Sequence, residues 1–301
     1  MNFSTNLGNQ ALQRDSSSLL GNQFPKCYPF IKWAGGKSQL LREISKSIPS
    51  SFDRYFEPFL GGGAVFFHLT SKENRRVTAF LSDTNQELIN TYKMVKESVE
   101  ELIQILRFHE KEYYKGRQEY YYKLRTSMPI SYLERAARFI TLNKTCFNGL
   151  YRVNSKGIFN VPIGRYKNPL ICDAQNLRNV SLILRKSDTK LTVSDYKDLL
   201  SESASEGDFV YLDPPYSPVS STANFTGYTN TGFGNEDQLQ LALTFKKLHE
   251  RGCKILLSNS DTPAVRKLYI GFPSTVIKAN RAINSKASKR TGHTELLIRN
   301  F

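Results

Sequence analysis

The sequence predicts an α/β fold, in which a Rossmann-like sheet accepts an inserted, mostly helical module that carries a hairpin. Short apolar segments alternate with helical segments over much of the chain. A Gly-rich turn at residues 61–63 follows the first of these apolar segments. Acidic residues stand at the ends of three more, and parallel sheets gather such residues at the edge where ligands bind.

The elements of the sheet follow from apolar runs and helical spacing. The expected strands, all short and apolar, lie at residues 54–57, 77–81, 190–193, 209–212 and 254–257, with two more near the end of the chain. The expected helices, which repeat apolar residues at helical spacing, lie at residues 37–48, about 85–95, about 236–251 and 263–269.

Three regions of different composition predict the domain organisation. Residues 1–25 are rich in Ser, Asn and Gln without a sustained period, so we expect a flexible polar tail. Residues 97–170 interrupt the alternation, because 97–146 read as helical and 147–169 are punctuated by Gly and Pro, as in a hairpin. We therefore expect a sheet domain from residues 26–96 and 171–301, with a separate module at 97–170.

The charge distribution points to a polyanionic partner. The chain of 301 residues has 42 Lys and Arg against 27 Asp and Glu, a net charge of +15. Residues 107–167 carry thirteen basic and four acidic residues, and residues 278–299 carry six and one. Two segments in which basic residues predominate, in a chain that is otherwise nearly neutral, favour a nucleic-acid partner over the simpler interpretation as solvated helix faces.

Other classes of protein are disfavoured by the composition. No apolar run approaches the roughly 20 residues needed to cross a bilayer, and no signal peptide is evident, so we expect a soluble, cytoplasmic protein. The Cys and His residues, four of each, are scattered without a C-x-x-C pair. We therefore expect neither a metal site nor disulfides.

Asp83, Asp195 and Asp213 follow expected parallel strands. A single such Asp is commonly a helix cap, but three at one edge beside a Gly-rich turn favour a ligand site. The dinucleotide fingerprint fails because Phe66 occupies the third Gly position, and a P-loop fails because Ile31 stands where its first Gly belongs. A cofactor with a ribose but no essential pyrophosphate remains, and S-adenosylmethionine has that shape.

The segment Asp213-Pro214-Pro215-Tyr216 directly follows an apolar strand. Two consecutive prolines stiffen the loop and remove two backbone donors, although a plain turn is the simplest interpretation. The segment offers a carboxylate, a carbonyl and an aromatic ring to one ligand. Hydrogen bonds from an exocyclic amine to Asp213 and the Pro214 carbonyl would localise the lone pair of the nitrogen, and Tyr216 could stack on a flipped base.

Four segments together resemble the Dam family of DNA adenine-N6 methyltransferases, the class alpha amino-methyltransferases with an Asp-Pro-Pro-Tyr motif. They are residues 32–37, 56–63, 147–154 with 159–166, and 213–216. The resemblance runs from about residue 30 to residue 301. It implies transfer of a methyl group from S-adenosylmethionine to N6 of a flipped adenine in double-stranded DNA, in the site GATC, by a monomer that needs no metal.

The resemblance also implies roles for individual residues. The catalytic group comprises Asp213, Pro214 and Tyr216. The cofactor-binding positions are Trp33, Lys37, Phe59, Gly61, Asp83 and Asp213. The DNA-binding positions are Lys32, Phe147, Asn148, Leu150, Arg152, Pro162 and Tyr166, with Phe147 as a wedge in the duplex. The basic run at residues 286–290 resembles a phosphate-gripping loop, and we assign Lys289 and Arg290 to it.

Two other functions compete with this interpretation. Related Asp/Asn-Pro-Pro-Tyr loops serve methyltransferases that act on RNA or on a protein glutamine, but the intact hairpin at residues 147–166 argues against them. A catalytically inactive DNA-binding regulator is the alternative from another class. The complete set of Trp33, Lys37, Asp83 and Asp213 argues against it.

Overall fold

The computed structural model describes residues 24–215, 233–279 and 293–301. Within these residues a mixed sheet has the strand order β3-β2-β1-β4-β5-β7-β6, which confirms the predicted α/β class. Its strands are β1 Arg54–Glu57, β2 Thr78–Asp83, β3 Lys190–Val193, β4 Phe209–Leu212, β5 Lys254–Ser260, β6 Ser274–Ala279 and β7 His293–Arg299. The pairs among β1 to β5 are parallel, whereas β7 pairs antiparallel with both β5 and β6.

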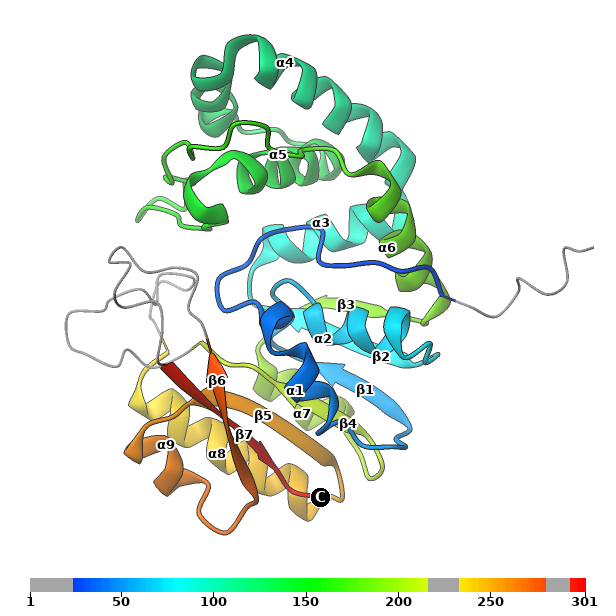
Figure 1. Ribbon diagram of the computed structural model, residues 1–301, viewed down its shortest axis with the longest axis vertical. Coiled ribbons are helices and arrows are strands. Elements are labelled where there is room, and N and C mark those ends of the chain that lie inside the picture. Colours follow the sequence, from blue (N-terminus) through cyan, green and yellow to red (C-terminus); the bar gives the residue numbers. More distant parts are fainter. Residues whose placement is uncertain (1–23, 216–232, 280–292) are drawn as a thin grey trace, which may run out of the picture.

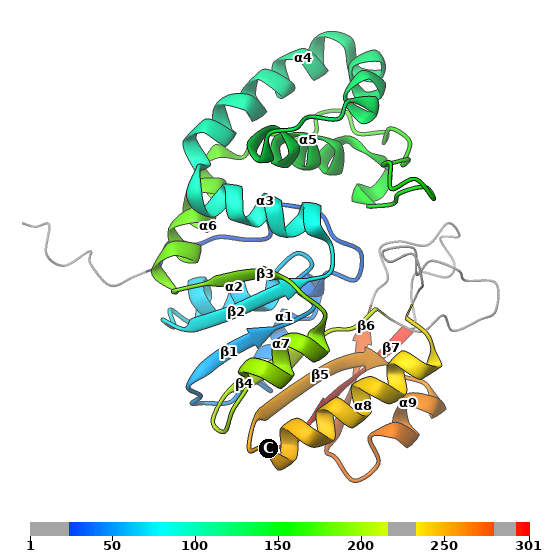
Figure 2. The same cartoon turned by 180° about the vertical axis from the view of Figure 1, so that it is seen from behind.

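Helices cover both faces of the sheet, as Figures 1 and 2 show from opposite sides. On one face lie α1 Leu41–Ser45, α2 Ala64–Phe67, α3 Gln86–Glu97 and α6 Ala174–Lys186. On the other lie α7 Tyr196–Ser203, α8 Asn235–Glu250 and α9 Pro263–Leu268. Strand β4 alternates between the two hydrophobic clusters, since Phe209 and Tyr211 belong to one and Val210 and Leu212 to the other.

Helices α4 Val99–Thr126 and α5 Tyr132–Thr145 lie apart from the sheet, beyond α3 and α6 (Figure 1). They occupy the stretch expected to be helical. An antiparallel arm follows, with isolated bridges between Cys146 and Ile163 and between Val153 and Phe159. We call residues 146–166 the hairpin. A single hydrophobic cluster includes buried residues of β1, β2, α3, α4 and α5, so these helices pack on the same core as the sheet.

The helix expected at residues 37–48 is shorter than predicted. A 3₁₀ turn, Lys37–Gln39, precedes α1, which begins at Leu41 and ends at Ser45. The 3₁₀ turn places the Lys37 side chain inside the molecule, 4% exposed, where its ammonium donates to the Gly35 carbonyl. The apolar spacing alone does not reveal that this lysine points inward.

Two helices are absent from the sequence-based expectation, although both have a clear first turn. Asp173 caps α6 through Asn176 N–H, and Asp195 caps α7 through Lys197 N–H. Each helix leads into a parallel strand of the sheet, α6 into β3 and α7 into β4. The predicted tail lies outside the described residues apart from its last two positions, of which Phe24 is buried.

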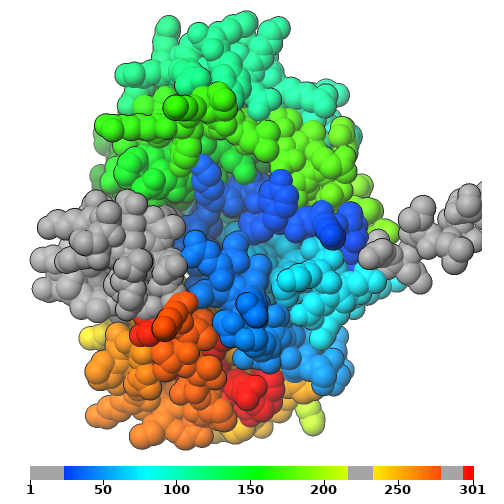
Figure 3. All heavy atoms as spheres, in the orientation of Figure 1, coloured from blue at the N-terminus to red at the C-terminus, as the bar shows by residue number. Residues whose placement is uncertain are grey.

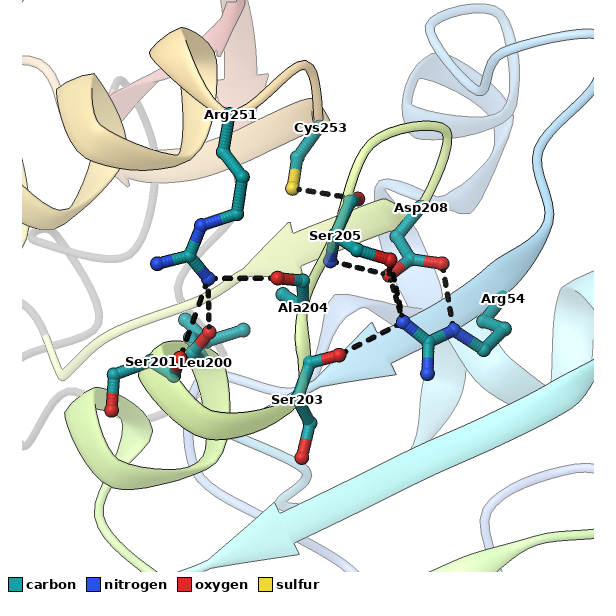
Figure 4. Close-up of polar contacts among 9 residues, drawn as sticks. All are labelled: Arg54, Leu200, Ser201, Ser203, Ala204, Ser205, Asp208, Arg251 and Cys253. Atoms are coloured by element: carbon teal, nitrogen blue, oxygen red, sulfur yellow. Dashed lines mark hydrogen bonds and ion pairs between the residues drawn. The ribbon is translucent and has the colours of Figure 1, made fainter.

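A polar network fastens the edge of the sheet remote from the carboxyl ends of the strands (Figure 4). Arg54 at the start of β1 donates to both carboxylate oxygens of Asp208, at 2.9 and 2.6 Å. The Asp208 side chain is fully buried and also accepts from Ser205 N–H. Arg251, beyond α8, donates to the carbonyls of Leu200 and Ala204 at the end of α7. This network fixes where β4 begins, and hence where Asp213 stands.

Candidate active site

The turn after β1, residues 58–63, brings two strand ends together. The Leu60 N–H donates to the Ser82 carbonyl at 2.9 Å, and the Gly61 N–H donates to Asp83 Oδ2 at 3.1 Å. Gly61 has a φ of 46°, in the left-handed region, and a Cβ there would lie 2.6 Å from Trp33 Cδ1. Glycine is therefore required by backbone conformation and by the close approach of the indole.

Asp83, the last residue of β2, is fixed at this turn. Its Oδ1 accepts from Asn85 N–H at 2.9 Å while Oδ2 accepts from Gly61. Burial raises the pKa of Asp83 to about 6, against the opposing effect of these backbone donors. Asp195 does not join it, because its side chain caps α7 instead. This is the helix-cap role that a single such Asp commonly has.

Asp213 follows β4 directly and pairs with Lys37. The Lys37 Nζ lies 2.7 Å from Asp213 Oδ1, and the side chains are 4% and 18% exposed. Burial raises the pKa of Asp213 to about 6, although the Lys37 ammonium opposes this. Burial disfavours the charged form of Lys37, but Asp213, Tyr211 and Glu295 together outweigh this effect and raise the lysine pKa. The carboxylate is thus held in place and ionised above about pH 6.

Pro214 and Pro215 continue the chain beyond Asp213, with Pro214 buried. Tyr216, the last member of the motif, lies outside the described residues. So do Lys289 and Arg290. The site described here therefore consists of the Lys37–Asp213 pair, the glycine turn with Asp83, and the aromatic residues around them.

Trp33 and Phe59 flank the glycine turn in different ways. The Trp33 ring stacks against Phe139 of α5 and Tyr151 of the hairpin, at centroid distances of 6.3 and 6.0 Å, and these two rings also contact each other at 5.3 Å. The Phe59 ring points to the opposite side, where it packs against Tyr196 of α7 at 5.1 Å. The Phe59 side chain is therefore part of the core around α7, whereas its backbone forms the turn.

Lys32 links the segment before the turn to the hairpin. Its N–H donates to Asn143 Oδ1 at 2.8 Å, and its carbonyl accepts from Asn143 Nδ2 at 2.7 Å. The same amide donates to the Gly149 carbonyl at 3.1 Å. The Lys32 ammonium lies 3.6 Å from the ring centre of Tyr166. Figure 3 shows the N-terminal segment, in blue, running between the helical module and the sheet.

The hairpin gathers the remaining residues expected to bind DNA. Phe147 is exposed and its N–H donates to the Pro162 carbonyl at 2.9 Å. Arg152 is exposed, with Nε donating to Asn160 Oδ1 at 2.7 Å. Asn148 has a φ of 56°. Leu150 lines a small cavity of about 180 Å³ between the hairpin and α5.

Some buried polar residues near the site carry no role in the sequence-based expectation, among them Glu57, Asn143 and Glu295. Glu57 stands in the segment before the glycine turn, so its position in the sequence could have identified it as a residue near the site. Asn143 closes a contact between residues 111 positions apart, which no local pattern reveals. Glu295 lies on β7 and is 5% exposed. An acidic residue directly before the apolar run at residues 296–298 is the signal that could have identified it.

The sheet order, the glycine turn and the acidic side chains at the carboxyl edge define the class of Rossmann-like methyltransferases. The chain belongs to a family within that class: the model of the D12 class N6 adenine-specific DNA methyltransferases matches residues 33–283. It is an adenine-specific DNA methyltransferase and acts on DNA.

Curated relatives cover nearly the whole chain. The type II methyltransferase M.MjaIII of Methanocaldococcus jannaschii is 45% identical over 290 residues, 91% of this chain and 99% of that protein. The type II methyltransferase M1.LlaDCHI of Lactococcus lactis subsp. cremoris is 44% identical, over 91% and 95%. The DNA adenine methylase of Escherichia coli (strain K12) is 36% identical, over 89% and 93%.

The described residues contain no helix with the length and apolar composition needed to cross a membrane. Within the same ranges, no cluster of three or more His, Cys, Asp or Glu side chains could hold a metal ion. The four cysteines are free thiols.

Proposed function

We propose that this enzyme transfers a methyl group from S-adenosylmethionine to N6 of an adenine flipped out of duplex DNA, within the sequence GATC. The observation that carries the proposal is the Asp213 carboxylate, which lies 2.7 Å from the Lys37 ammonium and precedes two prolines. A rigid loop with an acceptor-only side chain suits a ligand that donates, as an exocyclic amine does.

The residues around the glycine turn fit this cofactor. Asp83 presents a carboxylate that two backbone N–H groups orient, which suits the hydroxyls of a ribose. We assign Trp33, Lys37, Phe59, Gly61, Asp83 and Asp213 to the cofactor site. S-adenosylmethionine would supply an electrophilic methyl group on its sulfonium, so the protein needs to hold the acceptor amine in line with that methyl group.

The protein's own contribution to the reaction is orientation and charge. Asp213 and the Pro214 carbonyl accept hydrogen bonds from the two N–H bonds of the amine, which directs its lone pair away from the ring. The Asp213 carboxylate also faces the positive charge that develops on the nitrogen. We propose that Tyr216 stacks on the flipped base.

The hairpin and the basic module supply DNA recognition in this proposal. Residues 97–170 form the target-recognition domain, and residues 26–96 with 171–301 form the catalytic domain. We assign base or backbone contacts to Lys32, Phe147, Asn148, Leu150, Arg152, Pro162 and Tyr166. Lys289 and Arg290 hold phosphates. The enzyme works as a monomer in the cytoplasm, where chromosomal DNA is reached.

Methyl transfer to three kinds of acceptor tests the proposal. The enzyme is incubated with labelled S-adenosylmethionine and a duplex that contains GATC, the same duplex with that site scrambled, or an RNA of equal length. Label in N6-methyladenine of the GATC duplex alone is the expected result. Label in the RNA favours the related methyltransferases, label in the scrambled duplex contradicts the GATC site, and no label with intact DNA binding favours an inactive regulator.

A further inference from the structure

One face of the sheet presents a row of polar side chains at its carboxyl edge, which we call the polar row: Glu57, Asp213, Ser258 and Glu295. Strand register places them together. Phe56 pairs with Val210 and Leu212 with Leu257, so Glu57 and Asp213 follow neighbouring strands on the face that also holds Tyr211. Ser260 pairs with Glu295, two residues along β5 from Ser258.

Side-chain geometry agrees with this register. The Ser258 hydroxyl donates to Glu295 Oε2 at 3.4 Å, and both residues are buried, at 0% and 5% exposure. Strand β7 runs antiparallel to β5, so its first residues reach the edge where the parallel strands end. Glu295 therefore lies at the same edge of the sheet as Asp213, although 82 residues separate them along the chain.

The charged groups of the polar row and the Lys37 ammonium do not form separate one-to-one ion pairs. Lys37 brings a buried ammonium, and the carboxylates of Asp213 and Glu295 both act to raise its pKa against the opposing effect of burial. Glu57 is already occupied, because its Oε2 accepts from the Tyr55 hydroxyl at 2.8 Å and from Phe66 N–H at 3.2 Å. Burial raises the pKa of Glu57 to about 8, so at neutral pH this carboxyl is largely protonated.

We propose that Glu295 is a positioning residue for methyl transfer: from β7 it shares the Lys37 ammonium with Asp213, and so sets the charge and direction of the Asp213 carboxylate. This inference rests on the proposed function of the site. Because Glu295 balances part of the lysine charge, Asp213 keeps its basicity while Lys37 holds its Oδ1. The Oδ2 atom of Asp213 then remains directed at the N6 amine of the adenine.

A titration of Asp213 tests the inference without reference to activity. The carboxyl ¹³C resonance of Asp213, assigned by its loss in Asp213→Asn, is followed from pH 4 to 9 in the wild type and in Glu295→Gln. Lys37, Glu57, Tyr55, Tyr211 and Glu295 are the titratable groups that face it, and the variant changes one of them. Loss of a neighbouring negative charge should move the midpoint to lower pH by roughly one unit.

The same variants are then compared in single turnover with labelled S-adenosylmethionine and a GATC duplex. Glu295→Gln should slow transfer roughly ten- to hundredfold and move the acid limb of the rate to lower pH, with DNA affinity unchanged. Glu295→Asp, which keeps the charge, should keep the limb near its wild-type pH. Glu202→Gln, an exposed acid on α7, should alter neither.

The outcomes separate the two proposals. An Asp213 midpoint that does not move in Glu295→Gln overturns the inference, whatever the rate. So does a slower rate with an unmoved acid limb, since that describes a purely structural residue. Should Glu295→Gln unfold, Glu295→Asp and Glu295→Asn are titrated in the same way, and equal midpoints overturn the inference too. A wild-type enzyme that labels no adenine contradicts the proposed function, while the titration still decides on Glu295.

Discussion

Asp213 combines burial, a lysine partner and a proline-stiffened loop in one residue. Asp213→Ala should reduce methyl transfer at least a hundredfold, because the amine loses an acceptor and Lys37 loses its partner at 2.7 Å. DNA affinity should change little, since the proposed phosphate contacts lie elsewhere in the chain. Asp195→Ala is the matched control: it removes only a cap of α7, costs about 1 kcal/mol of stability, and should leave transfer intact.

Asp213 also predicts the acid side of the pH profile. The pKa of its carboxyl is raised to about 6, so the carboxylate dominates above that pH and the neutral acid below it. The neutral acid accepts hydrogen bonds poorly, and the single-turnover rate should therefore fall tenfold for each unit below about pH 6. A rate that stays flat from pH 7 to 5, with the protein still folded, would exclude Asp213 as the ionised acceptor.

Arg152 illustrates how a single contact separates base reading from phosphate binding. Asn160 accepts from its Nε at 2.7 Å and from its Nη2 at 3.3 Å, which holds the guanidinium fork in one orientation on the hairpin. Such a fork matches guanine O6 and N7 and discriminates by about 1–3 kcal/mol. Arg152→Ala should lose discrimination at an outer G·C pair, measured as relative rates on duplexes with every single-base change in GATC.

Lys156, at the exposed end of the same hairpin, provides the comparison for Arg152. A phosphate contact carries no sequence information, so Lys156→Ala should weaken binding to all duplexes by a similar factor. If Arg152→Ala behaves in the same way, Arg152 is one more phosphate contact and the assignment fails.

At the scale of elements, the Arg54–Asp208 network determines where β4 starts (Figure 4). Arg54→Ala leaves the buried Asp208 carboxylate with Ser205 donors but without its guanidinium. The free energy of unfolding in urea should drop by about 2–3 kcal/mol. Arg266→Ala breaks an exposed ion pair with Asp261 and should change it far less. Equal effects would show that burial of Asp208 is unimportant here.

The elements that sequence predicts well are those with local patterns. The run 209–212 is apolar throughout, as a strand buried on both faces requires, and the structure places β4 there. The segments 174–186 and 196–203 mix polar and apolar residues. The cap Asp173 follows the segment 147–169, which is punctuated by Gly and Pro, whereas the cap Asp195 follows the strand at 190–193, a position that suits a ligand site as well as a helix cap. Both helices were therefore missed, and the capping role of Asp195 is apparent only from the structure.

The residues of the candidate site likewise divide into those that a local sequence pattern predicts and those that it does not. Asp83 and Asp213 follow strands and could be found from the sequence, as could the glycine turn. The partners that hold them could not: Lys37 meets Asp213 across 176 residues, and Asn143 meets Lys32 across 111. Such pairs exist only once the sheet has brought distant segments together, so no window along the chain contains them.

At the scale of the whole molecule, most of the charge of +15 is concentrated in two segments. The second contains Lys289 and Arg290, which lie outside the described residues. Changing both to Ala should flatten the slope of log affinity against log salt by about two, because each neutralised phosphate contributes roughly one unit. Lys246→Ala with Lys247→Ala on α8 removes the same charge from another surface and should leave the slope unchanged.

The Asn143 amide has a consequence for engineering. It binds the backbone of Lys32 and the carbonyl of Gly149 at once, and a Cβ on Gly149 would lie 2.4 Å from the Lys32 side chain. A hairpin transferred from a relative therefore brings with it only part of the residues that hold it in place. Specificity swaps between relatives should be cut so that donor residues 32–33 and 139–166 travel as one cassette. A chimera joined at residue 146 alone would combine a hairpin from one relative with the Lys32 and Asn143 positions of another, which do not match it.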